Sequence, residues 1–503
     1  MIQDIFVREP EKWSPHKYQT KAMKFLLEHS CAALFLDPGL GKTSITLGAI
    51  KILKKKKLIK KVLLIAPLRV CYSVWPREIQ KWEDFKDLKI EVLHGNNKDS
   101  ALKKEADIYV INPEGLDWLL QVKKVKVVSQ KTGKTKTKIE IDTKRFKALG
   151  FDTLVIDELT KFKNRASSRF EVLKSVHKTF GRRWGLTGSP ASNGLLDLFG
   201  QCYILDEGRS LGQYITQYKS KYFEPVDHNR FVWVPRPGAV EQIYERVRPL
   251  ALRMAAEDYL EMPQLIENNI LLDLPDAARE IYDRLEQDLI AKIDGGVVFA
   301  LNAGVASGKC RQLANGGLYL DPELKETGFA IAGGKRKWSN LHFEKVDALV
   351  DLIEELQGEP LLVAYDFEHD LDRLREKLGK DVPYIGGRVT PNRSKELERL
   401  WNSGQLPVLL GHPQSIGHGL NLQEVGRHVA WHSMTWDFEL YDQFIRRVLR
   451  QGNKNKKVFV HHFMMRNTVD QIMYYSVKSK DRGQQAFFKG LQELAKTRSR
   501  NLK

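Results

Sequence analysis

Short apolar runs alternate with amphipathic stretches in two separate blocks of the chain. In the first block the runs expected to form strands are 32–36, 62–66, 108–111, 153–156 and 184–186, and in the second they are 361–364, 408–410, 428–431 and 458–461. Stretches with helical spacing of apolar residues lie between them, among them 43–53, 346–356 and 437–449. Apolar strands separated by helices are typical of parallel sheets covered on both faces. The pattern predicts an α/β fold with two parallel-sheet lobes, at about residues 1–205 and 336–490.

The region between the lobes has a different pattern. Residues 206–335 carry helical spacing in 239–256 and 276–293 and few runs that resemble strands. We expect a mostly helical insertion and linker there, and a basic tail at 491–503. A length of 503 residues fits two or three domains of ordinary size.

The charge balance of the chain indicates a class of binding partner. The chain has 81 Lys and Arg against 63 Asp and Glu, a formal net charge of +18. Such an excess favours a polyanion, most often nucleic acid, although a basic surface that only aids solubility is the alternative. Segment 121–147 has ten basic and two acidic residues, and its alternating Val and Lys predict a protruding β-hairpin. This hairpin either contacts the nucleic-acid backbone or is a solvated insertion.

Composition disfavours several other classes. The four cysteines are far apart and form no Cys-x-x-Cys pair, which disfavours a zinc site or a disulfide framework. The sequence begins without the apolar run of a signal peptide, and it contains no stretch of eighteen apolar residues. We therefore expect a soluble, cytoplasmic protein that does not cross a membrane.

The first chemical motif follows the strand expected at 32–36. It reads Asp37-Pro38-Gly39-Leu40-Gly41-Lys42-Thr43, and Thr43 opens the helix expected next. Gly39 and Gly41 permit backbone conformations that point amides at phosphate oxygens, and the helix N-terminus adds partial positive charge. Lys42 would reach the β- and γ-phosphates of ATP, and the Thr43 hydroxyl would ligate Mg²⁺. Leu36 stands where the strict phosphate-loop pattern has its first glycine.

Two further motifs close later strands of the first block. Asp157 and Glu158 follow the run 154–156; Asp157 would hold Mg²⁺, and Glu158 would orient and deprotonate the attacking water. The alternative is a solvated strand end. The string 186–190, Leu-Thr-Gly-Ser-Pro, either offers hydroxyl groups that hydrogen-bond to the carboxylate pair or is a plain turn.

The second block supplies arginines. On a helix, Gln443, Arg447 and Arg450 recur at i, i+4 and i+7 and would share one face. Arg447 and Arg450 would then act as arginine fingers on the γ-phosphate. The alternative is a basic helix on the DNA backbone, which fits Arg446.

In this order the motifs resemble the Swi/Snf-type translocases of helicase superfamily 2, from about residue 13 to residue 484. The resemblance implies two RecA-like lobes, with Gln19 in Lys17-Tyr18-Gln19 as the adenine contact. It also implies that Gly417, Gly419, Asn421 and Leu422 lie between nucleotide and DNA, and that 75–78 belongs to an element contacting a DNA strand. The string 409–423, with Arg-Gln-Gly at 450–452, most resembles a phage and prophage branch.

Two positions depart from the family pattern. Thr160 stands where the family usually has His, three positions after the Asp of the carboxylate pair. Gly411-His412 replaces a small hydroxyl residue common in the family, and His412 and His418 either contact the nucleic-acid backbone or pack. His461 and His462 lie in a strand pattern and are expected to be structural.

The resemblance implies an ATP-dependent translocase that moves on duplex or branched DNA in replication, recombination or repair. Its DNA contacts would be to the backbone, and phage or host replication and recombination proteins are candidate partners in a bacterial cytoplasm. One alternative is a helicase that separates RNA or DNA strands, with the 121–147 hairpin as its separating pin. Another is a DNA-binding scaffold that does not hydrolyse ATP.

Overall fold

The structure is a computed structural model that describes residues 11–128, 135–188, 190–191, 194–226, 233–254, 256–294, 299–320, 337–417 and 419–479. The chain divides into two compact units, Met1–Leu260 and Glu261–Lys503. Within the described residues, no helix has both the length and the apolar character needed to cross a membrane.

Unit 1 is built on a seven-stranded, wholly parallel sheet in the order β11-β1-β8-β7-β2-β4-β3. Its strands are β1 (Cys31–Leu36), β2 (Val62–Ile65), β3 (Ile90–Val92), β4 (Ile108–Ile111), β7 (Thr153–Asp157), β8 (Arg182–Thr187) and β11 (Ala251–Met254). All five strands predicted in the first block are present, and β2 and β4 are buried along their whole length. Both of these strands are apolar throughout, as expected for strands whose two faces are covered by helices.

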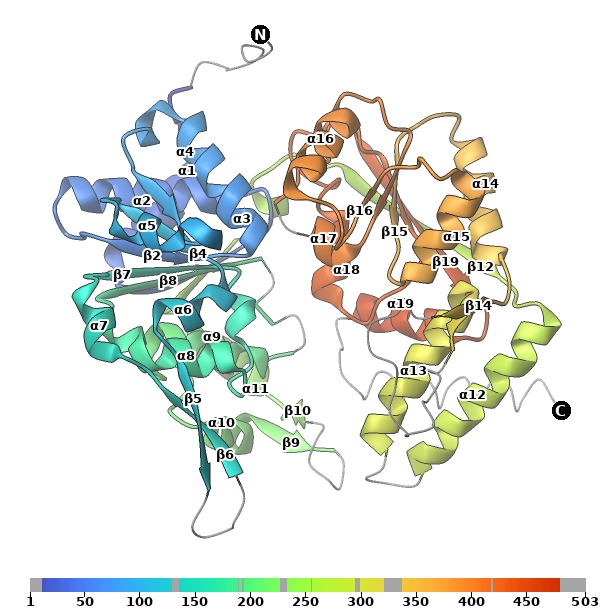
Figure 1. Cartoon of the computed structure of the whole chain (residues 1–503), viewed down its shortest axis with the longest axis horizontal. Coiled ribbons are helices and arrows are strands. Elements are labelled where there is room, and N and C mark those ends of the chain that lie inside the picture. Colours follow the sequence, from blue (N-terminus) through green and yellow to red (C-terminus); the bar gives the residue numbers. More distant parts are fainter. Residues whose placement is uncertain are drawn as a thin grey trace. The chain divides into compact units, whose positions relative to one another are not determined.

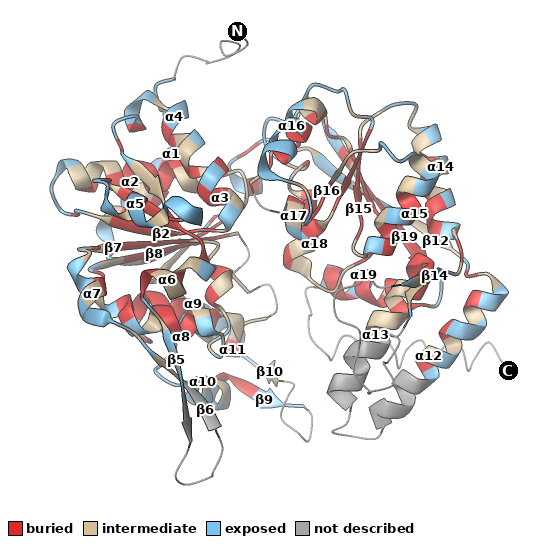
Figure 2. Ribbon diagram, viewed as in Figure 1, coloured by how far each residue is buried: buried red, intermediate tan, exposed pale blue. Residues whose placement is uncertain are grey.

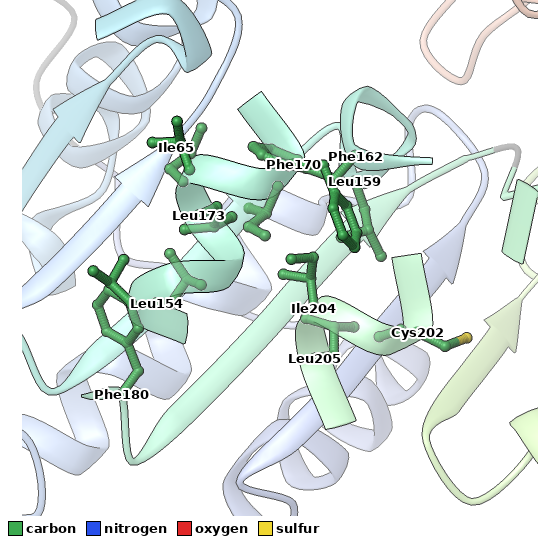
Figure 3. Packing of buried hydrophobic residues seen from close by; sticks show 14 of the residues in the cluster. Ile65, Leu154, Leu159, Phe162, Phe170, Leu173, Phe180, Cys202, Ile204 and Leu205 are labelled. Atoms are coloured by element: carbon green, nitrogen blue, oxygen red, sulfur yellow. The ribbon is translucent and has the colours of Figure 1, made fainter. Parts of the chain in front are cut away.

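The helices of unit 1 lie on the two faces of this sheet (Figure 1). They are α1 (Lys17–Glu28), α2 (Lys42–Lys55), α3 (Leu68–Ser73), α4 (Trp75–Lys81), α5 (Lys98–Lys103), α6 (Leu116–Leu119), α7 (Thr143–Ala148), α8 (Ser168–Val176), α9 (Asp197–Asp206), α10 (Ile215–Tyr222) and α11 (Ala239–Val247). On one face, Phe170 of α8 and Ile204 of α9 join Leu154 of the sheet in a single apolar cluster (Figure 3). This packing fixes the strand ends at which the candidate motifs lie.

The predicted hairpin is confirmed. Strands β5 (Lys123–Val128) and β6 (Thr135–Glu140) pair antiparallel from Lys123↔Glu140 to Val128↔Thr135, and they project from the body of unit 1 (Figure 1). Val122 and Ile139 pack against the core and anchor its base. The connecting residues 129–134 lie outside the described part of the chain.

Unit 2 holds a six-stranded parallel sheet in the order β12-β19-β18-β15-β17-β16. Its strands are β12 (Gln264–Leu272), β15 (Leu361–Ala364), β16 (Tyr384–Ile385), β17 (Val408–Gly411), β18 (His428–Trp431) and β19 (Lys457–Met465). Its helices are α12 (Asp276–Asp294), α13 (Phe299–Asn315), α14 (Glu344–Glu355), α15 (Glu368–Leu378), α16 (Pro391–Asn402), α17 (Pro413–Ile416), α18 (Phe438–Ile445) and α19 (Val469–Ser479). The strands are mostly buried, and the outer faces of the helices are exposed (Figure 2). The expectation of two parallel-sheet lobes is confirmed.

The region 206–335, expected to be a mostly helical insertion and linker, contains both helices and strands. It contributes β11 to the sheet of unit 1 and β12 to the sheet of unit 2, and the units divide at Leu260. Its remaining strands are the short pair β9 (Phe223–Pro225) and β10 (Trp233–Pro235), and β13 (Gly317–Tyr319), which pairs with β14 (Trp338–Asn340). Strands β11 and β12 lie at sheet edges, where one side is free of a partner and polar residues are tolerated. The tail expected at 491–503 lies outside the described residues.

Acid is expected to destabilise unit 2 more than unit 1. Burial lowers the pKa of His342 and His461 to about 4 and of His432 and His462 to about 3, and all four belong to unit 2. An unfolded histidine titrates near pH 6.5, so the unfolded chain binds more protons below that pH and the folded state loses stability. The loss is about 1–2 kcal/mol per buried histidine at pH 5.

Hydrogen exchange at pH 7.5 and pH 5, corrected for intrinsic rates, measures this effect. Protection of β18 and β19 should fall further than protection of β2 and β7. In unit 1 burial instead raises the pKa of Asp157 to about 6, which acts in the opposite direction. Greater loss of protection in unit 1 would contradict the expectation.

Candidate ATP-hydrolysis site

The glycine-rich loop joins the carboxyl end of β1 to the first residue of α2, Lys42. Gly39 and Gly41 have φ of 97° and 79°, in the left-handed region that favours glycine, and Gly41 is the N-cap of α2. A Cβ on Gly41 would lie 2.4 Å from Gln19 Nε2. The Lys42 ammonium folds back over the loop and donates to the Leu36 carbonyl at 2.7 Å. The loop therefore places a helix N-terminus and a lysine at one point, which suits a phosphate chain.

Gln19 lies against this loop, as the resemblance implies. Its Oε1 accepts from the His16 backbone at 2.9 Å, and its Nε2 donates to the Leu40 carbonyl at 3.4 Å. The side chain thus ties the start of α1 to the phosphate loop. Its contact with adenine stays a prediction.

Asp157 ends strand β7, and β1, β8 and β7 are neighbours in the sheet. Parallel strands end at a common edge, so the carboxylate pair lies beside the phosphate loop. Burial raises the pKa of Asp157 to about 6; the hydrogen bond from Trp75 and the charge of Lys42 act in the opposite direction. A buried carboxylate of this kind suits a divalent cation, which would favour its ionised form.

The resemblance places Trp75 in a DNA-contacting element, but its side chain is fully buried. Its Nε1 donates to Asp157 Oδ2 at 2.9 Å. The sequence offers no local sign of this hydrogen bond, because 82 residues separate the partners. Trp75 therefore positions the carboxylate pair from inside the lobe.

Glu158 has φ of 66°, an uncommon conformation for a residue other than glycine. Its Oε1 accepts from Thr160 Oγ1 at 2.9 Å and from Thr187 Oγ1 at 3.2 Å. Of the two interpretations of the 186–190 string, the hydrogen bond to the carboxylate pair is present at Thr187, while Ser189 lies outside the described residues. Thr160, which replaces the usual His of the family, orients the same carboxylate.

Arg253, which belongs to none of the motifs above, also contacts residues at this edge of the sheet. Arg253 of β11 donates through Nη1 to Asp37 Oδ1 at 2.7 Å, to the Phe35 carbonyl at 3.1 Å and to the Gly188 carbonyl at 3.3 Å. In the sequence, the residues around Arg253 carry no sign of this role. The parallel pairing of β11 with β1 brings the arginine to the phosphate loop.

In unit 2 the expected shared helical face of Gln443, Arg447 and Arg450 is wrong. Helix α18 ends at Ile445, and the two arginines lie in the turns that follow. The Arg447 carbonyl accepts from the Leu422 backbone at 3.2 Å, a bond that a continuing helix would give to residue 451. The apolar period continues through Leu449 in the sequence, but the backbone turns back toward the 417–422 loop.

Both arginines nevertheless bind the same loop. Arg447 donates to the carbonyls of Gly417 at 2.7 Å and Leu420 at 3.1 Å, and Arg450 Nη1 donates to Asn421 Oδ1 at 2.6 Å. A Cβ on Gly417 would lie 2.9 Å from Gln443 Oε1, so the glutamine packs beneath the loop. Gly419 has φ of 76°, and its neighbour His418 is outside the described residues.

The remaining histidines have partners within unit 2. His412 Nε2 lies 3.5 Å from Asp366 Oδ1. His461 and His462 are buried, as expected for structural residues; His461 shares a hydrogen bond with His428 and His462 shares one with Tyr441.

Comparison with known proteins places the chain in a family. Residues 18–317 match the SNF2-related domain, and residues 344–452 match the helicase conserved C-terminal domain. Protein p41 of Acyrthosiphon pisum secondary endosymbiont phage 1 is 31% identical over 484 residues, which cover 93% of this chain and 96% of the relative.

More distant relatives are much longer proteins. The CHD3-type chromatin-remodeling factor PICKLE of Arabidopsis thaliana is 23% identical, with 92% of this chain matching 34% of its length. The DNA annealing helicase and endonuclease ZRANB3 of Bos taurus is 21% identical, with 92% of this chain matching 39% of its length. The chain thus spans about a third of these two relatives.

Among solved structures, the Sulfolobus solfataricus SWI2/SNF2 ATPase core in complex with dsDNA is similar at 21% identity and a TM-score of 0.42, covering 93% of this chain and 92% of that chain. The family itself is shown by the extent of the domain match and by the phage relative. The chain belongs to the SNF2-related family, the Swi/Snf-type branch of helicase superfamily 2, and is a nucleic-acid-dependent ATPase related to a phage protein.

Proposed function

We propose that this ATPase is a motor that moves along duplex or branched DNA and serves replication, recombination or repair. The observation that carries the proposal is Glu158, which Thr160 and Thr187 hold by hydrogen bonds at the sheet edge that carries the phosphate loop. This is the arrangement of a site that hydrolyses ATP, which argues against a scaffold that only binds DNA. The net charge of +18 supports a polyanionic track.

In unit 1 each residue has a definite role in this proposal. The backbone amides from Pro38 to Thr43 cradle the phosphates, and Lys42 exchanges the Leu36 carbonyl for the β- and γ-phosphates. The Thr43 hydroxyl and Asp157 hold Mg²⁺, which supplies positive charge to the phosphates. Glu158 orients the attacking water and takes up its proton, and Gln19 reads the adenine.

In unit 2 Arg447 and Arg450 are the proposed arginine fingers. Both also hold the 417–421 loop, which the resemblance places between nucleotide and DNA. A shift of either arginine toward the γ-phosphate therefore shifts that loop. Gln443 packs against the same loop, and Gly419 is part of it. The residues proposed to respond to nucleotide are therefore also those proposed to contact DNA.

ATPase assays with different nucleic acids test the proposal. We expect duplex and forked DNA to stimulate the rate more than single-stranded DNA or RNA. Stimulation mainly by single strands would favour the strand-separating alternative, and no stimulation by any DNA would overturn the proposal. An unchanged rate in Lys42→Ala would favour the scaffold.

The hairpin formed by β5 and β6 is the proposed further contact to the DNA backbone. Substituting Lys124, Lys126 and Lys138 with Gln is expected to weaken duplex binding and to make its salt dependence shallower by about 0.9 for each phosphate that is no longer neutralised. Binding titrations from 50 to 200 mM salt measure both effects. The rate without DNA should not change, because the hairpin forms a two-stranded sheet of its own, apart from the sheet that carries β1 and β7.

A matched control removes three lysines elsewhere in unit 1. Lys55, Lys56 and Lys57 lie at the C-terminal end of α2, the end opposite the phosphate loop. Equal loss of affinity in this control would show that only net charge matters. Loss of strand separation in the hairpin variant, with translocation retained, would identify the hairpin as a separating pin.

A further inference from the structure

The last ten residues of unit 1, 251–260, contact the nucleotide edge at several points. Strand β11 pairs with β1 from Ala33↔Ala251 to Leu36↔Met254, and the Asp37 amide donates to the Met254 carbonyl at 3.2 Å. The strand therefore extends alongside β1 to the first residue of the phosphate loop. Unit 1 ends at Leu260, and unit 2 enters strand β12 at Gln264.

Both carboxylate oxygens of Asp37 accept hydrogen bonds from residues near the end of unit 1. Oδ1 accepts from Arg253 at 2.7 Å, and Oδ2 accepts from the Ala256 backbone at 3.1 Å. The Asp37 side chain is 8% exposed and the Arg253 side chain is 54% exposed, so the guanidinium covers the carboxylate from the solvent side. A shift of the Asp37 carboxylate would therefore move Arg253 and Ala256 or break their hydrogen bonds to it.

The same guanidinium also contacts the loop after β8. It donates to the carbonyl of Gly188, and the residue before Gly188, Thr187, donates to Glu158. Arg253 thus joins three parts of the site: the end of β1, the phosphate loop and the loop after β8. A change at any of these parts alters the geometry of the guanidinium.

Beyond Arg253 the chain forms a short turn that reaches α1. The Leu260 amide donates to the Ala256 carbonyl at 2.9 Å, and the Tyr259 ring lies 5.0 Å from the ring of Tyr18. Tyr18 precedes Gln19, the proposed adenine contact. Residues 256–260 therefore connect both the phosphate end and the expected base end of the nucleotide site to the junction with unit 2.

We propose that Arg253 is a positioning residue that transmits the state of the phosphate loop to the connector between the two units, residues 261–263. The proposal rests on nucleotide binding at Gly39–Thr43. Nucleotide binding moves Asp37, and Arg253 and the Ala256 amide move with it because they are hydrogen-bonded to it. The turn at 256–260 then passes this movement on to Glu261. Each link is a hydrogen bond, a ring contact or the chain itself.

Hydrogen exchange with and without the non-hydrolysable analogue AMP-PNP and Mg²⁺ tests the proposal without DNA. In the wild type, protection should change both at residues 37–43 and at residues 261–272. In Arg253→Gln, protection at 37–43 should remain while the response at 261–272 disappears. Arg253→Lys keeps the charge without the planar fork and should restore the response in part.

Steady-state kinetics give a second readout. Misplacement of catalytic groups by about 1 Å can cost about 10²-fold in rate, so kcat of Arg253→Gln should fall by about 10-fold or more, with a small change in the KM for ATP. The matched control is Arg248→Gln, whose side chain is exposed and pairs with exposed Glu245. The control should behave as the wild type.

Variants at Tyr259 test the same connection independently of whether the Arg253 variants fold correctly. Tyr259→Ala should weaken the response at 261–272, and Tyr259→Phe should keep it, because the ring contact with Tyr18 remains. An unaltered response at 261–272 in both Arg253→Gln and Tyr259→Ala would overturn the proposal. If AMP-PNP produces no protection at 37–43 in the wild type, the proposed nucleotide site itself is wrong.

Discussion

Glu158→Gln is expected to lower ATP hydrolysis by about 10²–10⁴-fold, the usual contribution of a positioned general base. Glutamine still offers an oxygen to the hydroxyls of Thr160 and Thr187, so the local structure should persist. It cannot accept a proton from water. The variant should therefore bind ATP with nearly wild-type affinity and trap the bound state.

The measurement pairs single-turnover hydrolysis with titration of a fluorescent ATP analogue. Glu171→Gln makes the same substitution on α8 of the same unit, where Glu171 forms a partly exposed pair with Lys174. This control should hydrolyse ATP normally. If Glu158→Gln retained more than about a tenth of the rate, the assignment of the general base would be wrong.

Arg450→Ala is expected to lower the rate by about 10³–10⁵-fold, the range typical of arginine fingers in phosphoryl transfer. Its guanidinium donates to Asn421 Oδ1 at 2.6 Å, in the loop that the proposal places beside the nucleotide. Nucleotide affinity should change far less than kcat, because a finger acts on charge that develops in the transition state.

Arg446→Ala provides the matched control four residues away. Arg446 forms an ion pair with Asp442 within unit 2 through Nε, at 2.8 and 2.9 Å. Loss of this partly exposed pair should change the rate by less than about threefold. Equal losses in the two variants would indicate that both residues act only on the stability of unit 2, which thermal unfolding of each variant would reveal.

Strands that are buried on both faces were easier to predict from the sequence than strands that are short or exposed. Strands such as β2 and β15 were recognised because every position in them is apolar and buried. Strands β3 and β16 are too short for a pattern to develop, with three and two residues. Strand β12 lies at an edge and has no fully buried position, with Leu265 and Leu271 exposed, so its sequence lacks the continuous apolar run of a central strand.

The site was predictable where chemistry is local in sequence. The phosphate loop and the carboxylate pair were proposed because each follows a strand and parallel strands end at a common edge, whereas the sequence left a plain turn as the alternative for Thr187. Trp75 and Arg253 were missed as site residues, because their contacts with Asp157 and Asp37 span 82 and 216 residues. The end of α18 was missed because tertiary bonds to the 417–422 loop, rather than any local signal, end the helix.

The position of β11 also bears on how the protein is made. Until residues 251–254 leave the ribosome, β1 is an edge strand, and its sequence Cys-Ala-Ala-Leu-Phe-Leu is entirely apolar. An exposed apolar edge is prone to pair with other chains. A fragment ending near residue 205 would keep every ATP motif of unit 1 and still lack the strand that closes the sheet. Nascent chains of that length are thus the ones most in need of a chaperone.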